Sequence, residues 1–477
     1  MDYTTYRSPF SARYASLPMQ RIFSEQHKFE TWRRLWVILA ECEQALGLPI
    51  TDAQLDELRA NITNIDFDAA RQHERTLRHD VMAHVHAYGD VCPTARPIIH
   101  LGATSCYVGD NADVLLLREG LQLVRARLVQ VARALHAFAW QHKDVPVLGF
   151  THFQPAQPTT LGKRACLWLY DVLCDLLETD QVLDSLLPLG CKGTTGTQAS
   201  FLALFDGDVD KVLELDRLTA QAMGFERSMP VTGQTYSRKQ DSCVLALLSQ
   251  IAQTAHKFSN DIRLLAHLKE VEEPFERSQV GSSAMPYKRN PMRCERMAGL
   301  ARFVISNVQN AAMTAAEQWL ERTLDDSANR RLSLAEGFLA TDGLLVLFAN
   351  VASGLVVYPR VIEQRLREEL PFMATEDILM HAVRKGGDRQ TLHERIRQHA
   401  MAAGQRIKQE GLPNDLLERI ADDPAFGLTP DELPDLLDPA RFTGLAARQA
   451  EDYLSGEAAQ ILETYRDIPS PDAEVTI

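Results

Sequence analysis

The sequence has no cysteine pattern that would indicate disulfides or a zinc site. Its eight cysteines form no CxxC pair, and none lies near histidine at the spacing of zinc ligands. Unpaired thiols are typical of proteins in a reducing compartment. The first ten residues, MDYTTYRSPF, also lack the basic and apolar regions of a signal peptide. We therefore expect a cytoplasmic protein with free thiols.

Long apolar runs and basic blocks are also missing. The most apolar stretch, residues 343–358, is shorter than the roughly 18 residues that a membrane-spanning helix needs, and it contains Asn350 and Ser353. It is typical of a buried helix. The net charge is −14, with 50 basic against 64 acidic residues. Such a field repels nucleic acid and anionic membranes, so neither is expected as a partner, and an anionic ligand would need locally clustered cations.

Helical periodicity, in contrast, is abundant. Between residues 112 and 143, apolar side chains recur at steps of three to five positions. Similar patterns cover 160–187, 241–272, 291–322 and 329–357, and no convincing strand alternation separates them. A helix of 30 residues is roughly 45 Å long, and helices of this length pack as bundles. We therefore predict an all-α fold built on a long-helix bundle, with surplus apolar faces buried by oligomerisation.

Gly- and Pro-rich segments suggest where this chain divides. Residues 89–111 end a helical N-terminal segment, and a second break lies near Tyr358 and Pro359. A chain of 477 residues is also too long for one ordinary compact core. The predicted parts are an N-terminal helical domain, a central long-helix bundle and a smaller C-terminal helical domain, at 1–111, 112–363 and 364–477.

Two segments present histidines. GFTHFQPAQPTT (149–160) places His152 in an expected loop between glycine and prolines. LRHDVMAHVH carries His79, His84 and His86, whose spacing matches neither HxxxH nor HExxH, so no metal is expected there. Taken alone, a loop histidine is as often solvated as it is functional.

Two further segments suit an anionic ligand. GCKGTTGTQASF (190–201) lacks the GxxxxGK[ST] pattern of a P-loop, although its Thr and Gln side chains could donate to an anion. ERTLDDSANRR (321–331) carries Arg322, and if its second half begins a helix, Ser327 and Arg331 share one face. A single surface arginine more often forms an ion pair with a neighbour than it binds a ligand. A binding site is favoured here because several such segments occur in one chain.

The stretch GSSAMPYKRNP (281–291) has no hydrophobic periodicity and is a loop. Two prolines exclude a regular helix, and Gly281 permits backbone angles that other residues avoid. A solvated linker would account for such a loop if it stood alone.

Together these segments resemble the fumarase/aspartase superfamily, whose members eliminate fumarate from succinyl-type substrates, and 281–291 looks like its signature loop. Within the superfamily the chain resembles the adenylosuccinate lyase family, from Tyr6 to Phe442, and the resemblance fades towards the C-terminus. The segments that carry it, in order, are SPFSARYAS, RHDVMAH, HLGATSCYVGDN, GFTHFQPAQPTT, KGTTGTQASF, GSSAMPYKRNPMRCE and WLERTLDDSANRR.

The resemblance implies a cofactor-free and metal-free β-elimination in purine biosynthesis. Adenylosuccinate would give AMP and fumarate, and succinylaminoimidazole carboxamide ribotide would give aminoimidazole carboxamide ribotide. The C–N bond breaks when a base removes a proton beside a carboxylate and an acid protonates the leaving nitrogen. His152 matches the acid, with Glu295 orienting it. Ser282 matches the base, which needs a closed loop and Lys288 to stabilise its alkoxide.

The remaining roles are implied by the same comparison. His79, beside the acid, joins the catalytic set. Arginine suits the nucleotide because its planar fork binds phosphate oxygens bidentately. The implied substrate-binding residues are Arg13, Tyr14, Arg78, His79, Asp80, Thr104, Ser105, Thr151, Gln234, Lys288, Asn290, Arg296, Arg322, Ser327 and Arg331.

The resemblance also implies a homotetramer whose active sites are shared between chains and take a small-molecule nucleotide. Two alternatives stay open. A sister lyase acting on argininosuccinate or fumarate would need fewer arginines, because its substrate has no phosphate. A structural bundle protein without activity, like the lens crystallins derived from this superfamily, would not need both His152 and Ser282.

Overall fold

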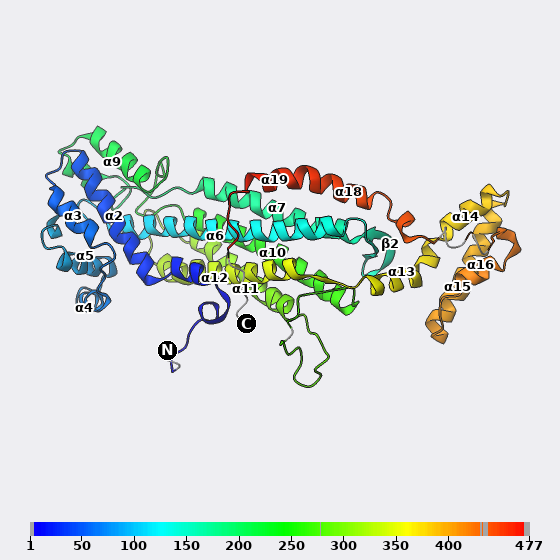
Figure 1. Ribbon diagram of the computed structural model, residues 1–477. Helices are drawn as coiled ribbons and strands as arrows, with labels where there is room; N and C mark the ends of the chain where they lie inside the picture. Colours follow the sequence, from blue (N-terminus) through cyan, green and yellow to red (C-terminus); the bar gives the residue numbers. More distant parts are fainter. Residues whose placement is uncertain (1–3, 277, 430–431, 433–436, 472–477) are drawn as a thin grey trace.

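Five long helices form the central bundle (Figure 1). The computed structural model describes residues 4–276, 278–429, 432 and 437–471. Apolar side chains at helical spacing build one continuous core, in which Leu128, Leu169 and Phe338 are almost completely buried. The bundle helices are α6 Ser105–Gln141, α7 Leu161–Ser185, α10 Lys239–His267, α11 Met292–Ala316 and α12 Asp325–Gly354.

Helix α12 is the innermost helix of the bundle. Among the described residues it alone is long and apolar enough to cross a membrane by length and composition, yet 83% of its most apolar window is buried inside the protein. Residues 337–349 are buried without interruption, with α6, α10 and α11 packed around them. A helix that is apolar all round is what the centre of a bundle requires.

A second core lies at the left end of the bundle in Figure 1, where α2 packs against α3, α6 and α9. Its largest side chains are Trp32, Trp36 and Tyr88. The predicted boundary at 111/112 falls inside α6, because the helix already begins at Ser105, within the segment 89–111. The elements of this part are α2 Glu25–Ala45, α3 Asp52–Ala60, α4 Phe67–Leu77, α5 Asp80–Val91, η2 Arg96–Ile98, α8 Ala199–Leu204 and α9 Val209–Ala222. The preceding elements, η1 Phe10–Tyr14 and α1 Leu17–Ile22, pack on the bundle core instead.

A third core lies at the other end, where Ile378, Leu392 and Phe426 are buried together. The predicted boundary at 363/364 falls inside α13, which begins at Pro359, a residue well suited to the first helical position. The elements of this part are α13 Pro359–Met373, α14 Thr375–Arg384, α15 Arg389–Glu410, α16 Leu416–Ala421, η3 Pro424–Phe426 and η4 Pro439–Phe442.

The chain then returns to the bundle, so the predicted domain 364–477 is not one unit. Helices α18 (Ala446–Tyr453) and α19 (Ala459–Thr464), joined by η5 (Leu454–Ala458), lie along α6 and α7 (Figure 1). Leu454 and Tyr465 belong to the central core, not to the distal one. Arg133 of α6 fastens this return segment by donating to the backbone carbonyls of Tyr465 and Ile468, at 2.7 and 3.0 Å.

The segment 149–160, expected to be a loop, is instead mostly part of a β-hairpin. β1 (Pro146–Thr151) pairs antiparallel with β2 (Gln154–Thr160), and His152 and Phe153 form the turn. Each strand of a two-stranded sheet has one edge without a partner strand. The prolines of β2, which have no N–H to donate, are therefore tolerated there. A second short pair, β3 (Val271–Glu272) with β4 (Val356–Val357), joins the ends of α10 and α12. The rest of the described chain is helical or irregular, and the all-α prediction is confirmed.

The N-terminal core encloses a carboxyl group, that of Glu43. Its side chain on α2 is fully buried, and neither carboxyl oxygen has a hydrogen-bond partner among the described residues. Burial therefore raises the pKa of Glu43 to about 9. The folded chain therefore holds this carboxyl protonated at pH values at which the unfolded chain, with an ordinary glutamate pKa near 4.5, has released the proton.

We expect the stability of this part to fall as pH rises between these two pKa values. The contribution of the protonated Glu43 carboxyl to stability is fully present below about pH 4.5. By pH 7 the free energy of unfolding is lower by on the order of 3 kcal/mol. Glu43→Gln, which cannot titrate, should flatten the dependence. Urea unfolding at pH 5.5 and 8, at one protein concentration, checks this. Glu41→Gln, which replaces a partly exposed carboxylate of the same helix that pairs with Arg59 at 2.6 Å, is the control and should keep the wild-type slope. Equal slopes in wild type and Glu43→Gln would contradict the prediction.

Candidate active site

Most of the predicted substrate-binding residues gather at one end of the bundle, which we call the polar end. Here α6, α10 and α12 begin, and α5 lies beside them. The Ser105 hydroxyl lies 3.3 Å from Nε2 of His79, and Arg331 donates to Asp80 at 2.9 Å. These contacts join the α5 side to the bundle. The polar end consists of Arg78, His79, Asp80, Thr104, Ser105, Gln234, Arg322, Ser327 and Arg331.

The turn before α5 sets the orientation of the His79 ring. Arg78 has a left-handed φ of 53°, which ends α4 and redirects the chain. His79 is the N-cap of α5, and its Nδ1 accepts a hydrogen bond from the Met82 N–H at 3.4 Å. With Nδ1 as the acceptor, Nε2 carries the proton and faces Ser105. The ring is thus a fixed donor at the surface of the polar end.

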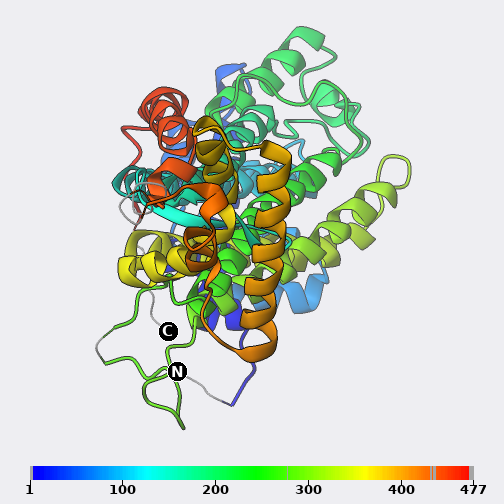
Figure 2. The ribbon, with the colours of Figure 1, turned by 90° about the vertical axis from the view of Figure 1, so that its right-hand side faces the viewer.

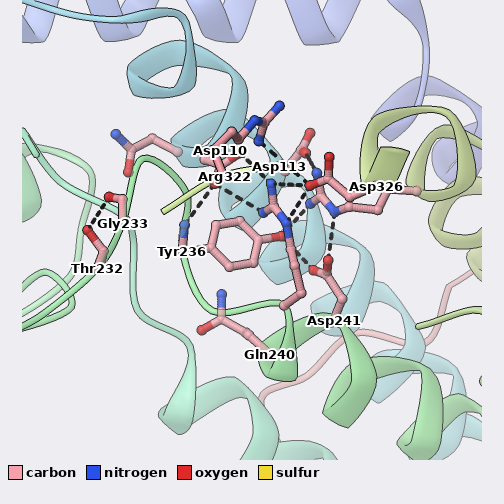
Figure 3. A network of polar contacts seen from close by, with 12 residues as sticks. Asp110, Asp113, Thr232, Gly233, Tyr236, Gln240, Asp241, Arg322 and Asp326 are labelled. Carbon is pink, nitrogen blue, oxygen red and sulfur yellow. Dashed lines mark hydrogen bonds and ion pairs between the residues drawn. The ribbon is translucent and has the colours of Figure 1, made fainter. Parts of the chain in front are cut away.

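A buried network of ion pairs lies beneath the polar end (Figure 3). Arg238, the residue before α10, donates its two Nη atoms to Asp110 of α6 at 3.0 and 3.1 Å. Its Nε donates to Asp326 of α12 at 2.8 Å. All three side chains are buried. One guanidinium therefore joins the N-terminal parts of three helices, each of which adjoins a predicted substrate-binding residue.

A second arginine continues the network. Arg330 pairs with Asp241 at 2.7 Å and with Asp113 at 2.8 Å, and it donates to the Tyr236 hydroxyl at 2.5 Å. That hydroxyl donates in turn to Asp241 at 2.5 Å. Most polar atoms of this network are paired, which gives rigidity, although the Asp326 Oδ1 has no hydrogen-bond partner among the described residues. Sequence reasoning missed it, although the signal was present: Asp110 and Asp113 interrupt the apolar stripe of α6.

The segments that carry Gln234 and Arg322 are held side by side. The Gln234 backbone N–H donates to the carbonyl of Glu321 at 3.0 Å. Gly233 permits this approach, because a Cβ there would lie 2.5 Å from the same carbonyl oxygen. Arg322 Nη1 lies 3.7 Å from Asp326 and its side chain is partly exposed. Amide and guanidinium donors are thus available together for an anion.

His152 lies far from the polar end in the same chain. Helix α6 starts at the polar end and runs for 37 residues towards the hairpin (Figure 1), a length of roughly 55 Å. Thr151 and His152 are exposed at the hairpin tip. They cannot meet the polar end within one chain.

The hairpin holds His152 in an unusual conformation. The φ angles of His152 and Phe153 are 52° and 56°, which suits a tight two-residue turn but is strained for residues other than glycine. The partly buried Arg164 supports the hairpin by donating to the Leu148 carbonyl at 2.6 Å. Gly149 is required where the strands approach, since a Cβ would lie 2.4 Å from the Gln157 carbonyl oxygen. The tip is therefore fixed from its base.

The loop that carries Ser282 projects from the bundle (Figure 2). Asn290 closes its base by donating from Nδ2 to the Gly281 carbonyl at 2.7 Å. Ser282 Oγ accepts a hydrogen bond from the Met285 N–H at 3.1 Å, and Lys288 is exposed. Asn290, predicted to bind substrate, thus uses one donor within the loop here.

Glu295 does not contact His152 within one chain. It is exposed in the first turn of α11, whereas the hairpin packs against α7, α13 and α18. Its predicted orienting role needs another chain. Arg296 follows Glu295 in the same turn.

Arg13 and Tyr14 lie on η1, at a fourth place in the fold. The segment packs on α12, where the Ser16 N–H donates to the buried Asp342 at 2.6 Å. A Cβ on Gly343 would lie 2.9 Å from the Cβ of Tyr14, so glycine is needed for this contact.

His84, another histidine of the 77–86 segment, has a structural role. His84 is buried and stacks on Phe29 at a ring distance of 3.7 Å, with Trp32 at its edge. Burial lowers the pKa of His84 to about 4, so the ring is neutral. It belongs to the N-terminal core and not to the polar end.

Comparison with known proteins places this geometry in a family. Residues 38–306 match the lyase family, and residues 371–453 match the adenylosuccinate lyase C-terminus. The chain is 52% identical over 468 residues to adenylosuccinate lyase of Saccharomyces cerevisiae, covering 98% of this chain and 97% of that enzyme. It is 51% identical over 470 residues to that of Schizosaccharomyces pombe, covering 98% of both. The 3-carboxy-cis,cis-muconate lactonizing enzyme of Pseudomonas putida superposes with a TM-score of 0.82 at 25% identity, over 95% of this chain and 99% of that one.

Proposed function

Because the chain belongs to the adenylosuccinate lyase family, we propose that it splits adenylosuccinate into AMP and fumarate, in active sites shared between the chains of a cytoplasmic homotetramer. Succinylaminoimidazole carboxamide ribotide would be cleaved by the same β-elimination. The observation that carries the proposal is the polar end, where Arg322, Arg331 and His79 offer donors to an anionic nucleotide.

The elimination would be divided between chains. His152 from one hairpin protonates the leaving nitrogen, and Glu295 of another chain stabilises the resulting imidazolium. Ser282, in the loop, removes the proton beside the carboxylate, and Lys288 stabilises the charge that develops. The polar end of a third chain holds the nucleotide. Closure of the 281–291 loop over the substrate would exclude water, which an alkoxide base requires.

Two observations support the tetramer. The first is the roughly 55 Å between His152 and the polar end along α6, which only antiparallel association of several bundles removes. The second is the apolar surface left open on bundle helices. Its residues are Leu167, Tyr170 and Leu177 of α7, Phe303 and Met313 of α11, and Leu332 of α12.

Purified protein given adenylosuccinate should change the ultraviolet absorbance as AMP forms, and fumarate should appear in equal amount. Argininosuccinate serves as the control substrate and should not be cleaved, because its lack of a phosphate leaves the arginines of the polar end unmatched. Cleavage of argininosuccinate alone would favour the sister lyase. Inertness towards both adenylosuccinate and the ribotide substrate would favour a bundle protein without activity.

A further inference from the structure

Arg322 is held close to a carboxylate with which it does not form a hydrogen bond. Its Nη1 has no hydrogen-bond partner among the described residues, although it is buried from solvent. The nearest acid is Asp326, whose Oδ2 lies 3.7 Å away, beyond the range of a hydrogen bond. The Arg322 side chain is still 23% exposed, so it can be reached from the polar end.

Asp326 is held by Arg238. Both Nε and Nη2 of Arg238 lie 2.8 Å from the Asp326 Oδ2, the same oxygen that faces Arg322. The other edge of the guanidinium is occupied by Asp110, and its face lies over the Tyr236 ring at 4.5 Å. The rigid fork of arginine offers separate edges to the two carboxylates at once. Figure 3 shows Asp326 and Arg322 within this network.

We propose that Arg238 is a positioning residue for the nucleotide: by binding Asp326 it keeps that carboxylate from closing on Arg322, whose donors stay free for the substrate phosphate. The proposal rests on the function proposed above. Without Arg238, the Asp326 carboxylate would need to move by only about 1 Å to form a charge-assisted hydrogen bond with Arg322. That bond would draw the guanidinium towards Asp326 and away from the polar end, where the exposed part of the side chain would meet the phosphate.

The experiment is a set of rescue variants, read by calorimetric binding of AMP and by KM for adenylosuccinate. Arg238→Met should weaken AMP binding and raise KM by at least about tenfold, the effect of one charge-assisted bond. Adding Asp326→Asn should restore AMP binding to within about threefold of wild type, because the competing charge is gone. Adding Asp110→Asn to Arg238→Met is the matched control. It removes an equally buried carboxylate that Arg238 also binds, and it should not restore AMP binding.

The matched control separates positioning from simple repair of the fold. If Asp110→Asn and Asp326→Asn rescue equally, removal of an unpaired buried charge explains both and the proposal is wrong. Unchanged AMP binding in Arg238→Met would also overturn it. Arg33→Lys replaces a buried arginine that holds two carbonyls elsewhere, at 2.5 and 2.6 Å; it should lower stability without changing AMP binding.

Two measurements keep the proposal testable if Arg238→Met does not fold. Asp326→Asn alone, with Arg238 still bound to Asp110, should bind AMP at least as tightly as wild type, and weaker binding would contradict the proposal. Arg238→Lys should also weaken AMP binding, and adding Asp326→Asn should also restore it, with both effects smaller than for Arg238→Met. Failure of the proposed function is distinct, because it would appear as a wild-type protein that does not cleave adenylosuccinate.

Discussion

Replacing Ser282 or His152 by alanine is expected to lower kcat at least roughly 10²-fold, the lower range for general acid–base groups, with almost no change in the thermal unfolding midpoint. Neither side chain belongs to a core. His152 is exposed at the hairpin tip, and Ser282 Oγ accepts a hydrogen bond from the Met285 N–H within the described part of the loop. The measurements are turnover at saturating adenylosuccinate and calorimetric unfolding.

Ser283→Ala is the control for the serine, because it removes a neighbouring hydroxyl from the same loop. It should keep near-normal turnover. Near-normal turnover in Ser282→Ala would instead move the base to Ser283 or elsewhere. A large fall in the unfolding midpoint of either variant would indicate a structural residue and not a catalytic one.

The long helices could be predicted because their periodicity continues for many turns. The sequence pattern for 112–143 corresponds to α6, which starts slightly earlier at Ser105. The hairpin at 146–160 could not be recognised in the same way. Its second strand, QPAQPTT, has prolines and glutamines instead of alternating apolar residues, and its turn contains His152 and Phe153 in place of the usual Asn-Gly.

Local periodicity also does not predict which core a helix joins. Residues 446–464 have an amphipathic pattern that suits either the distal helices or the bundle, and only the folded chain shows that Leu454 and Tyr465 join the bundle core. The ion-pair network is similar. Asp110 and Arg238 are far apart in the sequence, and nothing in either segment alone predicts that one guanidinium joins them.

The residues of the candidate site were identified by resemblance, but their separation follows from the fold. Glu295 was predicted to orient His152, yet the two lie on different elements that do not pack together in one chain. This separation is informative: an orienting carboxylate needs hydrogen-bond distance. Either the pair acts across a subunit boundary or it does not act as a pair.

Mixing the two inactive variants His152→Ala and Ser282→Ala, then dissociating and reannealing them, is therefore expected to restore activity. In a shared site the histidine and the serine come from different chains. Random reassembly of equal amounts places an intact His152 opposite an intact Ser282 in about one quarter of the sites. Turnover should thus rise from near zero to roughly a quarter of that of reannealed wild type, with KM close to normal.

The controls are wild type carried through the same treatment and each variant reannealed alone. Each single variant should stay inactive, because all of its sites carry the lesion whatever their arrangement. The fraction of active sites should follow the product of the two mole fractions and peak at an equal mixture, which distinguishes assembled hybrids from a trace of contaminating wild type. If the mixtures stay inactive while wild type recovers, His152 and Ser282 act within one chain, and the loop must reach the hairpin without a partner.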